Sequence, residues 1–427
     1  MKTKLSARVR TLAPSATLAV DGTVKKLQSQ GKKILNLSLG EPDFDTPKNI
    51  QDAAILAMQK GHTHYTTTAG ITKLREEVAK KFLKENHISY DPSEIVVGVG
   101  SKQLLYNALM VLCDEGDEVI VPVPTWSTYI EQIKLCKATP CEAKMKPPFK
   151  LTVKDLEKKI SKKTKAIILN SPANPTGAVI EEEELKNITK LAMAKNVWII
   201  ADEIYEKILY MDTRRHAELD SASKEIPKQD GYRTVTRQVR DDKVKKIQHI
   251  SIASFGREIK ARTITINGFS KSYAMTGWRI GYAGGPKEVI SAMINLQSQT
   301  TSNTSSLAQY AGVEALTGSQ RSIKKMADAF AKRRRFLLKA FVADLDRLSV
   351  VPPEGAFYLF INVTKCLGKE YKTSSDWCTG LLEKEHVALV PGEAFLYPGW
   401  VRLSFAAADD VLEEAVKRIK RFVKISN

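Results

Sequence analysis

A serine, a lysine and an arginine occur close together between residues 264 and 285, in the stretch ITINGFSKSYAMTGWRIGYAGG. Lys271 follows a β-branched run that we expect to be a buried strand, and small and apolar residues surround it. In such a setting an ε-amine can lose its proton and form a Schiff base with a carbonyl. Ser270 and Arg279 flank it, and a hydroxyl with a guanidinium suits a phosphate monoester. Together they predict an aldehyde-bearing phosphate cofactor, namely pyridoxal 5'-phosphate.

Taken alone, Lys271 is more simply explained as a loop lysine and Arg279 as a surface charge, because charged residues are mostly exposed. Polar residues that follow other expected strands favour the cofactor instead. Gly100, Ser101 and Lys102 come directly after one such strand and open a helix. Backbone N–H groups and a hydroxyl at a helix N-terminus bind phosphate well.

Five further positions fit the same chemistry. Trp126 follows an expected strand, and it either packs in the core or stacks on a flat ring. Asn174 can donate to a ring hydroxyl, and Asp202 can pair with a protonated pyridine nitrogen. Tyr205 comes three residues after Asp202, so one helical turn would bring both to the same side. Arg402 lies within an apolar strand, either in a structural ion pair or as a bidentate clamp for a substrate carboxylate.

Short Ile- and Val-rich segments alternate with helical patterns along the first two thirds of the chain. The expected strands are residues 95–99, 118–122, 166–170, 197–201 and 263–267. Because each is largely apolar, the pattern predicts an α/β fold with a mostly parallel sheet covered by helices on both faces. Such sheets bind ligands at the carboxyl ends of their strands, where most of the residues above lie.

The length of 427 residues favours two domains. We expect residues 46–310 to form a large cofactor-binding domain and residues 311–427 a smaller α+β domain, which residues 1–45 join. Residues 211–246 are polar, highly charged and without a convincing period, which predicts an inserted surface loop.

The composition indicates which classes of binding partner to expect. No run of eighteen apolar residues exists and the N-terminus lacks a continuous apolar segment, so we expect a cytoplasmic chain without a membrane partner. The net charge of +18 suggests an anionic partner, but the basic residues are spread over helical stretches. We expect the densest run, residues 332–335, to be a solvated helix face and not a nucleic-acid site. The cysteines and histidines show no metal-ligand spacing, so no metal is expected.

The motifs GSKQ, SPANPTG, DEIYEKILY, SKSYAMTGWRIGY and VRLSFA occur in this order. They resemble the class I aminotransferases of pyridoxal-phosphate fold type I, most closely the bacterial aspartate aminotransferase subgroup. The resemblance covers the chain outside residues 211–246. It implies a homodimer with shared active sites that acts on amino acids and 2-oxo acids.

The resemblance also implies a role for each site residue. Lys271 would be the catalytic Schiff-base lysine. The groups around the cofactor would be Ser101, the Lys102 backbone, Ser270 and Arg279 at the phosphate, Asp202 at the ring nitrogen, Asn174 and Tyr205 at the ring oxygen, Trp126 against the ring, and Tyr65 from the other subunit. The substrate would meet Gly40, Arg402, Trp126 and Asn174, with the Lys102 side chain at its distal carboxylate.

We therefore predict ping-pong transfer of an amino group from L-aspartate to 2-oxoglutarate, with Lys271 moving the proton. An aromatic or kynurenine aminotransferase remains an alternative, as does an aspartate/prephenate enzyme, although relatives that use prephenate often carry lysine where this chain has Ala13. A carbon–sulfur lyase is disfavoured by the sequence Asn-Pro-Thr-Gly at 174–177. A transcription regulator would need another domain, and about forty residues before Gly40 are too few for one.

Overall fold

The structure is a computed structural model that describes residues 5–10, 12–14, 16–210, 247–343 and 347–425. The inserted loop predicted at residues 211–246 lies outside these ranges. Within them, no helix combines the length and the apolar character needed to cross a membrane.

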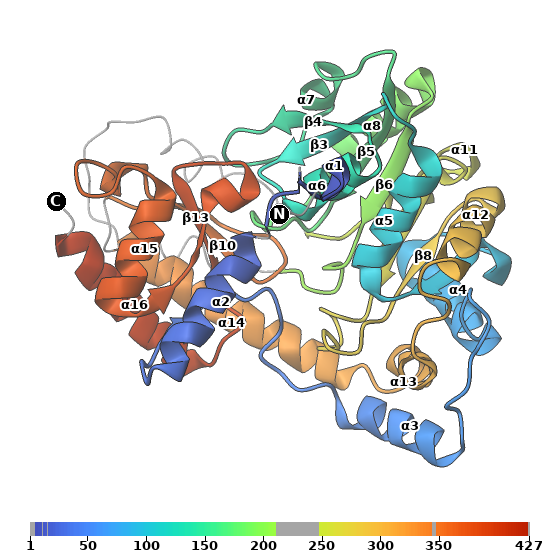
Figure 1. The fold of residues 1–427 in the computed structure, drawn as a ribbon, viewed down its shortest axis with the longest axis horizontal. Coiled ribbons are helices and arrows are strands. Elements are labelled where there is room, and N and C mark those ends of the chain that lie inside the picture. Colours follow the sequence, from blue (N-terminus) through green and yellow to red (C-terminus); the bar gives the residue numbers. More distant parts are fainter. Residues whose placement is uncertain (1–4, 11, 15, 211–246, 344–346, 426–427) are drawn as a thin grey trace.

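The larger sheet has seven strands, in the order β2-β8-β7-β6-β5-β3-β4 (Figure 1). They are β2 (Ile95–Gly98), β3 (Glu118–Val123), β4 (Thr139–Lys144), β5 (Thr164–Asn170), β6 (Trp198–Asp202), β7 (Thr263–Gly268) and β8 (Gly281–Gly284). Neighbours from β7 to β4 pair in parallel, whereas β8 is antiparallel to both β7 and β2. The predicted mostly parallel sheet is confirmed, with each of the five expected strands present.

Two strands of this sheet were not predicted. β4 has the sequence TPCEAK and lies at an edge of the sheet, so most of its residues are not buried and no apolar run marks it. β8 has the sequence GYAG, and two glycines in four residues conceal a strand because glycine has no β preference. An edge position and a glycine-rich strand both remove the hydrophobic signal on which the prediction depends.

Helices cover both faces of the larger sheet (Figure 1). Those around it are α3 (Lys48–Gln59), α4 (Thr72–Asn86), α5 (Gly100–Leu112), α6 (Thr128–Leu135), α7 (Val153–Glu157), α8 (Glu182–Lys195), α11 (Arg257–Lys260), α12 (Lys287–Ser298) and α13 (Ser306–Thr317). Alternate strand residues serve opposite faces. Ile167 and Ile199 pack in the cluster that includes α8, whereas Ile168 and Ile200 pack in the cluster formed with α5, α6 and α12.

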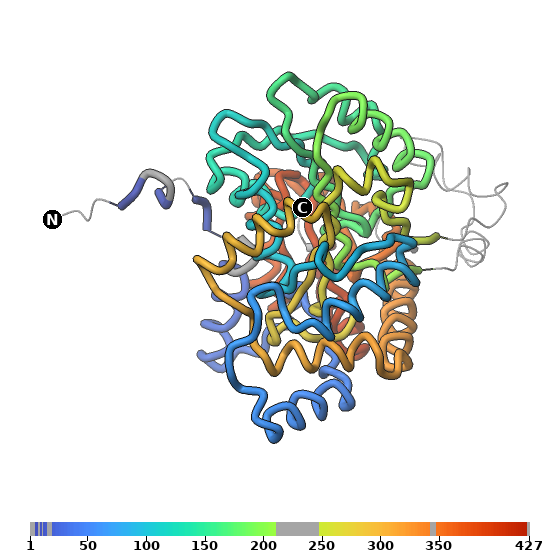
Figure 2. Tube along the Cα trace, turned by 90° about the vertical axis from the view of Figure 1, so that its right-hand side faces the viewer, coloured from blue at the N-terminus to red at the C-terminus, as the bar shows by residue number. Residues whose placement is uncertain are grey.

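A second, antiparallel sheet has the order β12-β13-β10-β9. Its strands and the helices beside it are β9 (Ser349–Val351), β10 (Tyr358–Asn362), β12 (Val390–Pro391), β13 (Trp400–Ser404), α14 (Arg321–Ala343), α15 (Ser374–Glu385) and α16 (Asp409–Ile425). The N-terminal part returns to this region: β1 (Leu35–Asn36) pairs in parallel with β11 (Val387–Ala388), and Val24 of α2 (Ala16–Ser29) packs near Leu382. Figure 1 shows α2 beside the C-terminal helices. In Figure 2, α1 (Ala7–Arg10) lies away from the body of the chain.

The basic run at residues 332–335 corrects one prediction. Its first and last residues are exposed, but Arg333 and Arg334 are buried, so the run is not a fully solvated face. Arg333 donates to both carboxylate oxygens of Asp43, at 2.7 and 2.8 Å, and to Asp409 at 3.0 Å. The expectation failed because these carboxylates come from distant parts of the chain, which the local charge pattern does not reveal.

Candidate active site

Lys271 lies in the loop after β7, with its ammonium turned toward the N-terminal segment, where Nζ donates a hydrogen bond to the carbonyl oxygen of Gly40. Burial lowers the pKa of Lys271 to about 8; the charge of Glu41 opposes this shift, and those of Arg402 and Arg279 add to it. An amine with such a pKa is partly unprotonated near neutral pH, which makes it a nucleophile and a proton acceptor.

The start of α5 lies close to a guanidinium and a hydroxyl. Gly100 has φ +76° there, a backbone conformation that favours glycine, and a Cβ on it would lie 2.8 Å from Nη2 of Arg279. A Cβ on Gly268 would lie 3.1 Å from the hydroxyl oxygen of Ser101. Ser270, which is buried, follows two residues later. The structure thus brings a helix N-terminus, hydroxyls and a guanidinium to the carboxyl ends of β2 and β7.

Asp202 ends β6 and is buried. The hydroxyl of Tyr129 donates to its Oδ2 at 2.6 Å. Burial raises the pKa of Asp202 to about 6, although the hydrogen bonds from Tyr129 and from the backbone of Ile204 act in the opposite direction. Tyr129 was not predicted from the sequence, where its only signal is that it follows Trp126 by three residues at the start of α6.

The aromatic side of the site carries a cation. The ammonium nitrogen of Lys102 lies 4.8 Å from the ring centroid of Trp126, and that ring packs edge-on against Tyr129 at 5.4 Å. Lys102 keeps access to solvent, but the packing around its ammonium and the charge of Arg279 lower its pKa. Within the described ranges no carboxylate pairs with Lys102, so its charge is available to an anionic ligand.

Arg402 projects from β13 and is only 2% exposed. Its Nη1 donates to Oδ1 of Asn174 at 3.0 Å and its Nη2 to the carbonyl of Ser38 at 2.7 Å, while Nε has no partner among the described residues. Of the two explanations considered from sequence, a structural ion pair is not found in the described part of the chain. A buried guanidinium without a carboxylate is suited to bind one from a ligand.

Tyr205 reaches this end of the site through a turn. The prediction of a helical turn for residues 202–205 is wrong: β6 runs into hydrogen-bonded turns, in which Glu206 N–H donates to the Glu203 carbonyl at 2.9 Å. The hydroxyl of Tyr205 lies 2.7 Å from that of Tyr358, a second residue that was not predicted from the sequence. A Cβ on Gly40 would lie 2.9 Å from the same Tyr358 oxygen, so the N-terminal segment passes close to this hydroxyl.

Three predicted site residues, Tyr65, Lys102 and Arg279, are exposed within their own chain, and 93% of the surface of Tyr65 is accessible. Hydrogen bonds join Lys271 to Gly40 and Arg402 to Asn174. Lys102 lies over Trp126, whose ring contacts Tyr129, the hydrogen-bond donor to Asp202.

The comparisons with known proteins agree with this geometry. The sequence model of the family "Aminotransferase class I and II" matches residues 32–419. The chain belongs to the class I and II aminotransferases.

Other members of this aminotransferase family match over nearly the full chain. An aspartate aminotransferase of Bacillus sp. is 42% identical, over 99% of this chain and 100% of that protein. An aspartate/prephenate aminotransferase of Nitrosomonas europaea is 39% identical, over 97% of this chain and 98% of the other. Among solved structures, the aspartate aminotransferase of Thermus thermophilus with maleate has a TM-score of 0.86 at 36% identity, covering 98% of this chain and 99% of its own.

Proposed function

We propose that this aminotransferase moves the amino group of L-aspartate to 2-oxoglutarate by a ping-pong reaction, with pyridoxal 5'-phosphate as cofactor. The observation that carries the proposal is that the partly buried amine of Lys271, with its pKa of about 8, shares a site with the buried, carboxylate-free guanidinium of Arg402. A nucleophilic amine and an unpaired cation are what a substrate with an α-carboxylate requires.

The side chains present fit the proposed cofactor. The phosphate would lie at the start of α5, with Ser101, Ser270 and Arg279, where a Cβ on Gly100 would fill the space beside the guanidinium. The ring nitrogen would face Asp202, whose Oδ2 is already held by a hydrogen bond. Trp126 would lie against the ring, and the phenol of Tyr205 and the amide of Asn174 would contact the ring oxygen. Asn174 has its Oδ1 engaged by Arg402, which leaves its NH₂ to donate.

The residues of this chain divide the chemistry between them. When bound, pyridoxal phosphate supplies the carbonyl that takes up the substrate amine and a ring that withdraws electrons from Cα. Lys271, once it leaves the Gly40 carbonyl, takes the proton from Cα of the substrate. It then delivers this proton to C4′, the carbon that bears the aldehyde in the free cofactor. Asp202 holds the proton on the ring nitrogen. Arg402, beside Gly40, fixes the α-carboxylate and so orients the Cα–H bond.

The preference for aspartate rests on Lys102. Its ammonium lies beside Trp126 without a carboxylate partner in the described ranges, a position from which it can bind a distal carboxylate. The Thermus thermophilus aspartate aminotransferase was solved with maleate, which is a dicarboxylate. Several relatives are named for aspartate, which supports the same preference.

We also propose that two copies assemble with shared sites. Helix α3 exposes Ile55, Leu56 and Met58, each about half accessible, and exposed apolar side chains grouped on one helix are typical of an interface. Tyr65 follows this helix and would enter the partner's site. In the proposed domain division, residues 1–45 belong with residues 311–427, and the β1–β11 pairing supports this.

A panel of amino donors with 2-oxoglutarate tests the function. The purified chain, loaded with pyridoxal phosphate, is expected to form glutamate fastest with aspartate. A higher kcat/KM with phenylalanine or kynurenine would replace the proposal with an aromatic aminotransferase. Release of pyruvate and ammonia from a cysteine conjugate would instead indicate a carbon–sulfur lyase. An assay with prephenate as acceptor tests the remaining alternative.

A further inference from the structure

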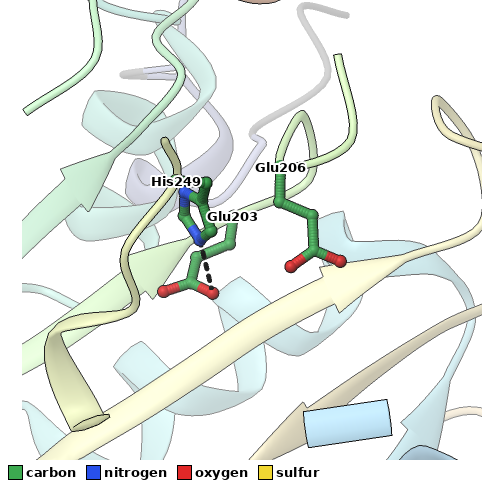
Figure 3. A group of neighbouring side chains, drawn as sticks. All are labelled: Glu203, Glu206 and His249. Atoms are coloured by element: carbon green, nitrogen blue, oxygen red, sulfur yellow. Dashed lines mark ion pairs between the residues drawn. The ribbon is translucent and has the colours of Figure 1, made fainter. Parts of the chain in front are cut away.

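Four ionisable side chains gather around the turn that follows Asp202. Glu203 is the next residue along the chain and Glu206 lies in the same turn, while Lys81 comes from α4 and His249 from the segment before α11. Their side chains are 4%, 7%, 4% and 8% exposed, respectively. Figure 3 shows Glu203, Glu206 and His249 converging on one another. None of the four takes part in the chemistry proposed above.

The contacts divide the group into two pairs. The ammonium of Lys81 pairs with Oε1 of Glu206, whose Oε2 accepts from Asn86 at 2.8 Å. Nε2 of His249 lies 3.1 Å from Oε2 of Glu203 (Figure 3). That oxygen also accepts from the hydroxyl of Ser251 at 2.6 Å and from Asn86 at 3.3 Å. In the described residues, His249 is thus the one group that can supply Glu203 with a directly paired positive charge.

A buried charge that lacks a partner is costly, so the protonation of His249 decides whether the group is electrically balanced. With two carboxylates and one ammonium, the group carries one excess negative charge until the imidazole is protonated. Burial by itself would lower the pKa of His249, but the carboxylate of Glu203 and then that of Glu206 raise it above its ordinary value, against the opposing charge of Lys81. Glu85, the remaining charged neighbour, lies 3.7 Å from Lys81 and pairs with Lys207 at 2.8 Å.

The pair is coupled to the turn that carries the proposed cofactor contacts. Glu203 N–H donates to the carbonyl of Ile266 in β7 at 2.9 Å, and its own carbonyl accepts from Glu206. Asp202 and Tyr205 lie on either side within the same four residues. The side chain that pairs with His249 is therefore carried by the backbone segment that joins both contacts.

We propose that His249 is a positioning residue, which as an imidazolium holds Glu203 and thereby fixes Asp202 and Tyr205 for cofactor binding. This inference rests on the proposed function, because Asp202 and Tyr205 are the residues proposed there to contact the cofactor. It makes the order of the turn depend on pH, because the pair loses its positive charge when His249 loses its proton.

The test compares His249→Gln, Glu203→Gln and the double variant with the exposed control His87→Gln, all as full-length chains. Selective ¹⁵N-histidine labelling follows the protonation of His249 by NMR, and urea unfolding and titration with pyridoxal phosphate are measured from pH 6 to pH 9. We expect His249 to titrate above its ordinary pKa in the unaltered chain and at a lower pH in Glu203→Gln. The stability that it contributes is fully present below its unfolded pKa and is lost as pH rises through its raised folded pKa.

In His249→Gln at pH 6, pyridoxal phosphate should bind about tenfold more weakly. This factor corresponds to a change of one pKa unit in the strength of the lost interaction. The double variant, which is neutral at both positions, should recover most of this loss, and His87→Gln should match the unaltered chain. The proposal is overturned if His249 stays neutral throughout, or if His249→Gln alters unfolding but not cofactor affinity, which would make the pair merely structural. If His249→Gln does not fold, the titration of His249 in Glu203→Gln decides. A chain that shows the coupling but rejects aspartate would contradict the proposed substrate and leave this inference standing.

Discussion

The hydroxyl of Tyr129 and the carboxylate of Asp202 are joined by a 2.6 Å hydrogen bond in the interior, between α6 and the end of β6. Both residues are almost fully buried, so the donor has no competition from solvent. Burial raises the pKa of Asp202 to about 6, and the phenol keeps it from rising further. Tyr129 therefore extends the pH range over which Asp202 is ionised.

Tyr129→Phe should raise the pKa of Asp202, because the hydrogen bond that favours the carboxylate is lost. At pH 6 the variant should bind pyridoxal phosphate about tenfold more weakly than the unaltered chain, as expected for a hydrogen bond to a charged group. At pH 8.5 the two affinities should approach each other. Tyr90→Phe, which removes another buried hydroxyl, is the control. An equal loss at both pH values would show that the phenol acts by packing alone.

Lys271→Ala should retain pyridoxal phosphate through its other contacts but lose amino transfer by several orders of magnitude, since the nucleophile and the proton carrier are the same group. Borohydride reduction of the unaltered chain should attach the cofactor to the peptide that contains Lys271. Peptide mapping by mass spectrometry identifies the site. Recovery of the label on another lysine would disprove the assignment.

The pKa of about 8 for Lys271 predicts how the cofactor-free chain takes up pyridoxal phosphate. Only the neutral amine attacks a carbonyl, so the rate of loading should rise with pH and level off above about 8. Stopped-flow absorbance from pH 6.5 to pH 9.5 measures the profile. A rate that continues to rise as steeply near pH 9.5 would mean that the amine is not desolvated as the structure indicates.

Lys102→Ala should lower kcat/KM for aspartate by about ten- to a hundredfold, the range of one charged hydrogen bond. The values for phenylalanine and alanine should change little, because their side chains offer no charge. Steady-state assays with the three donors give the comparison. Equal losses for all three donors would mean that Lys102 contacts the phosphate or serves packing. No loss for any donor would mean that Lys102 is a solvent-facing lysine without contact to the substrate.

Arg333→Met should lower the free energy of unfolding by about 1–3 kcal/mol, because it leaves Asp43 without its partner in a partly buried position. Arg335→Met, two residues away on the exposed face of α14, should change it by less than about 0.5 kcal/mol. Urea denaturation of both variants tests the difference. Similar effects for the two would mean that Arg333 contributes no more than a surface charge.

The sequence predicted the larger sheet well because its strands are short, apolar and followed by polar loops. Ser270, Asp202 and Ser101 were chosen from that pattern, and the structure places each at a carboxyl end of a strand. The glycine-rich β8 and the edge strand β4 lack the pattern, so they were missed for the same physical reason that the others were found.

Side-chain contacts between segments far apart in the chain could not be predicted from the sequence. Tyr358 stands within an apolar stretch and Tyr129 follows Trp126 at the start of a helix, and in neither place can a tyrosine that donates a hydrogen bond be distinguished from one that only packs. His249 meets Glu203 from 46 positions further along the chain, and Arg333 meets Asp43 from 290 positions away. Only the three-dimensional arrangement brings these partners together.

The short stretch from Ser38 to Gly40 has a mechanical consequence. Ser38 is anchored to Arg402 on the smaller sheet, and Gly40 accepts the hydrogen bond of Lys271 beside the larger one. Two residues of extended chain span at most about 7 Å, so this link has almost no slack. If the two sheets move apart, the change therefore falls on the Arg402 and Lys271 side chains and on these two hydrogen bonds. The segment therefore links Arg402 of the smaller sheet to the amine of Lys271 beside the larger sheet.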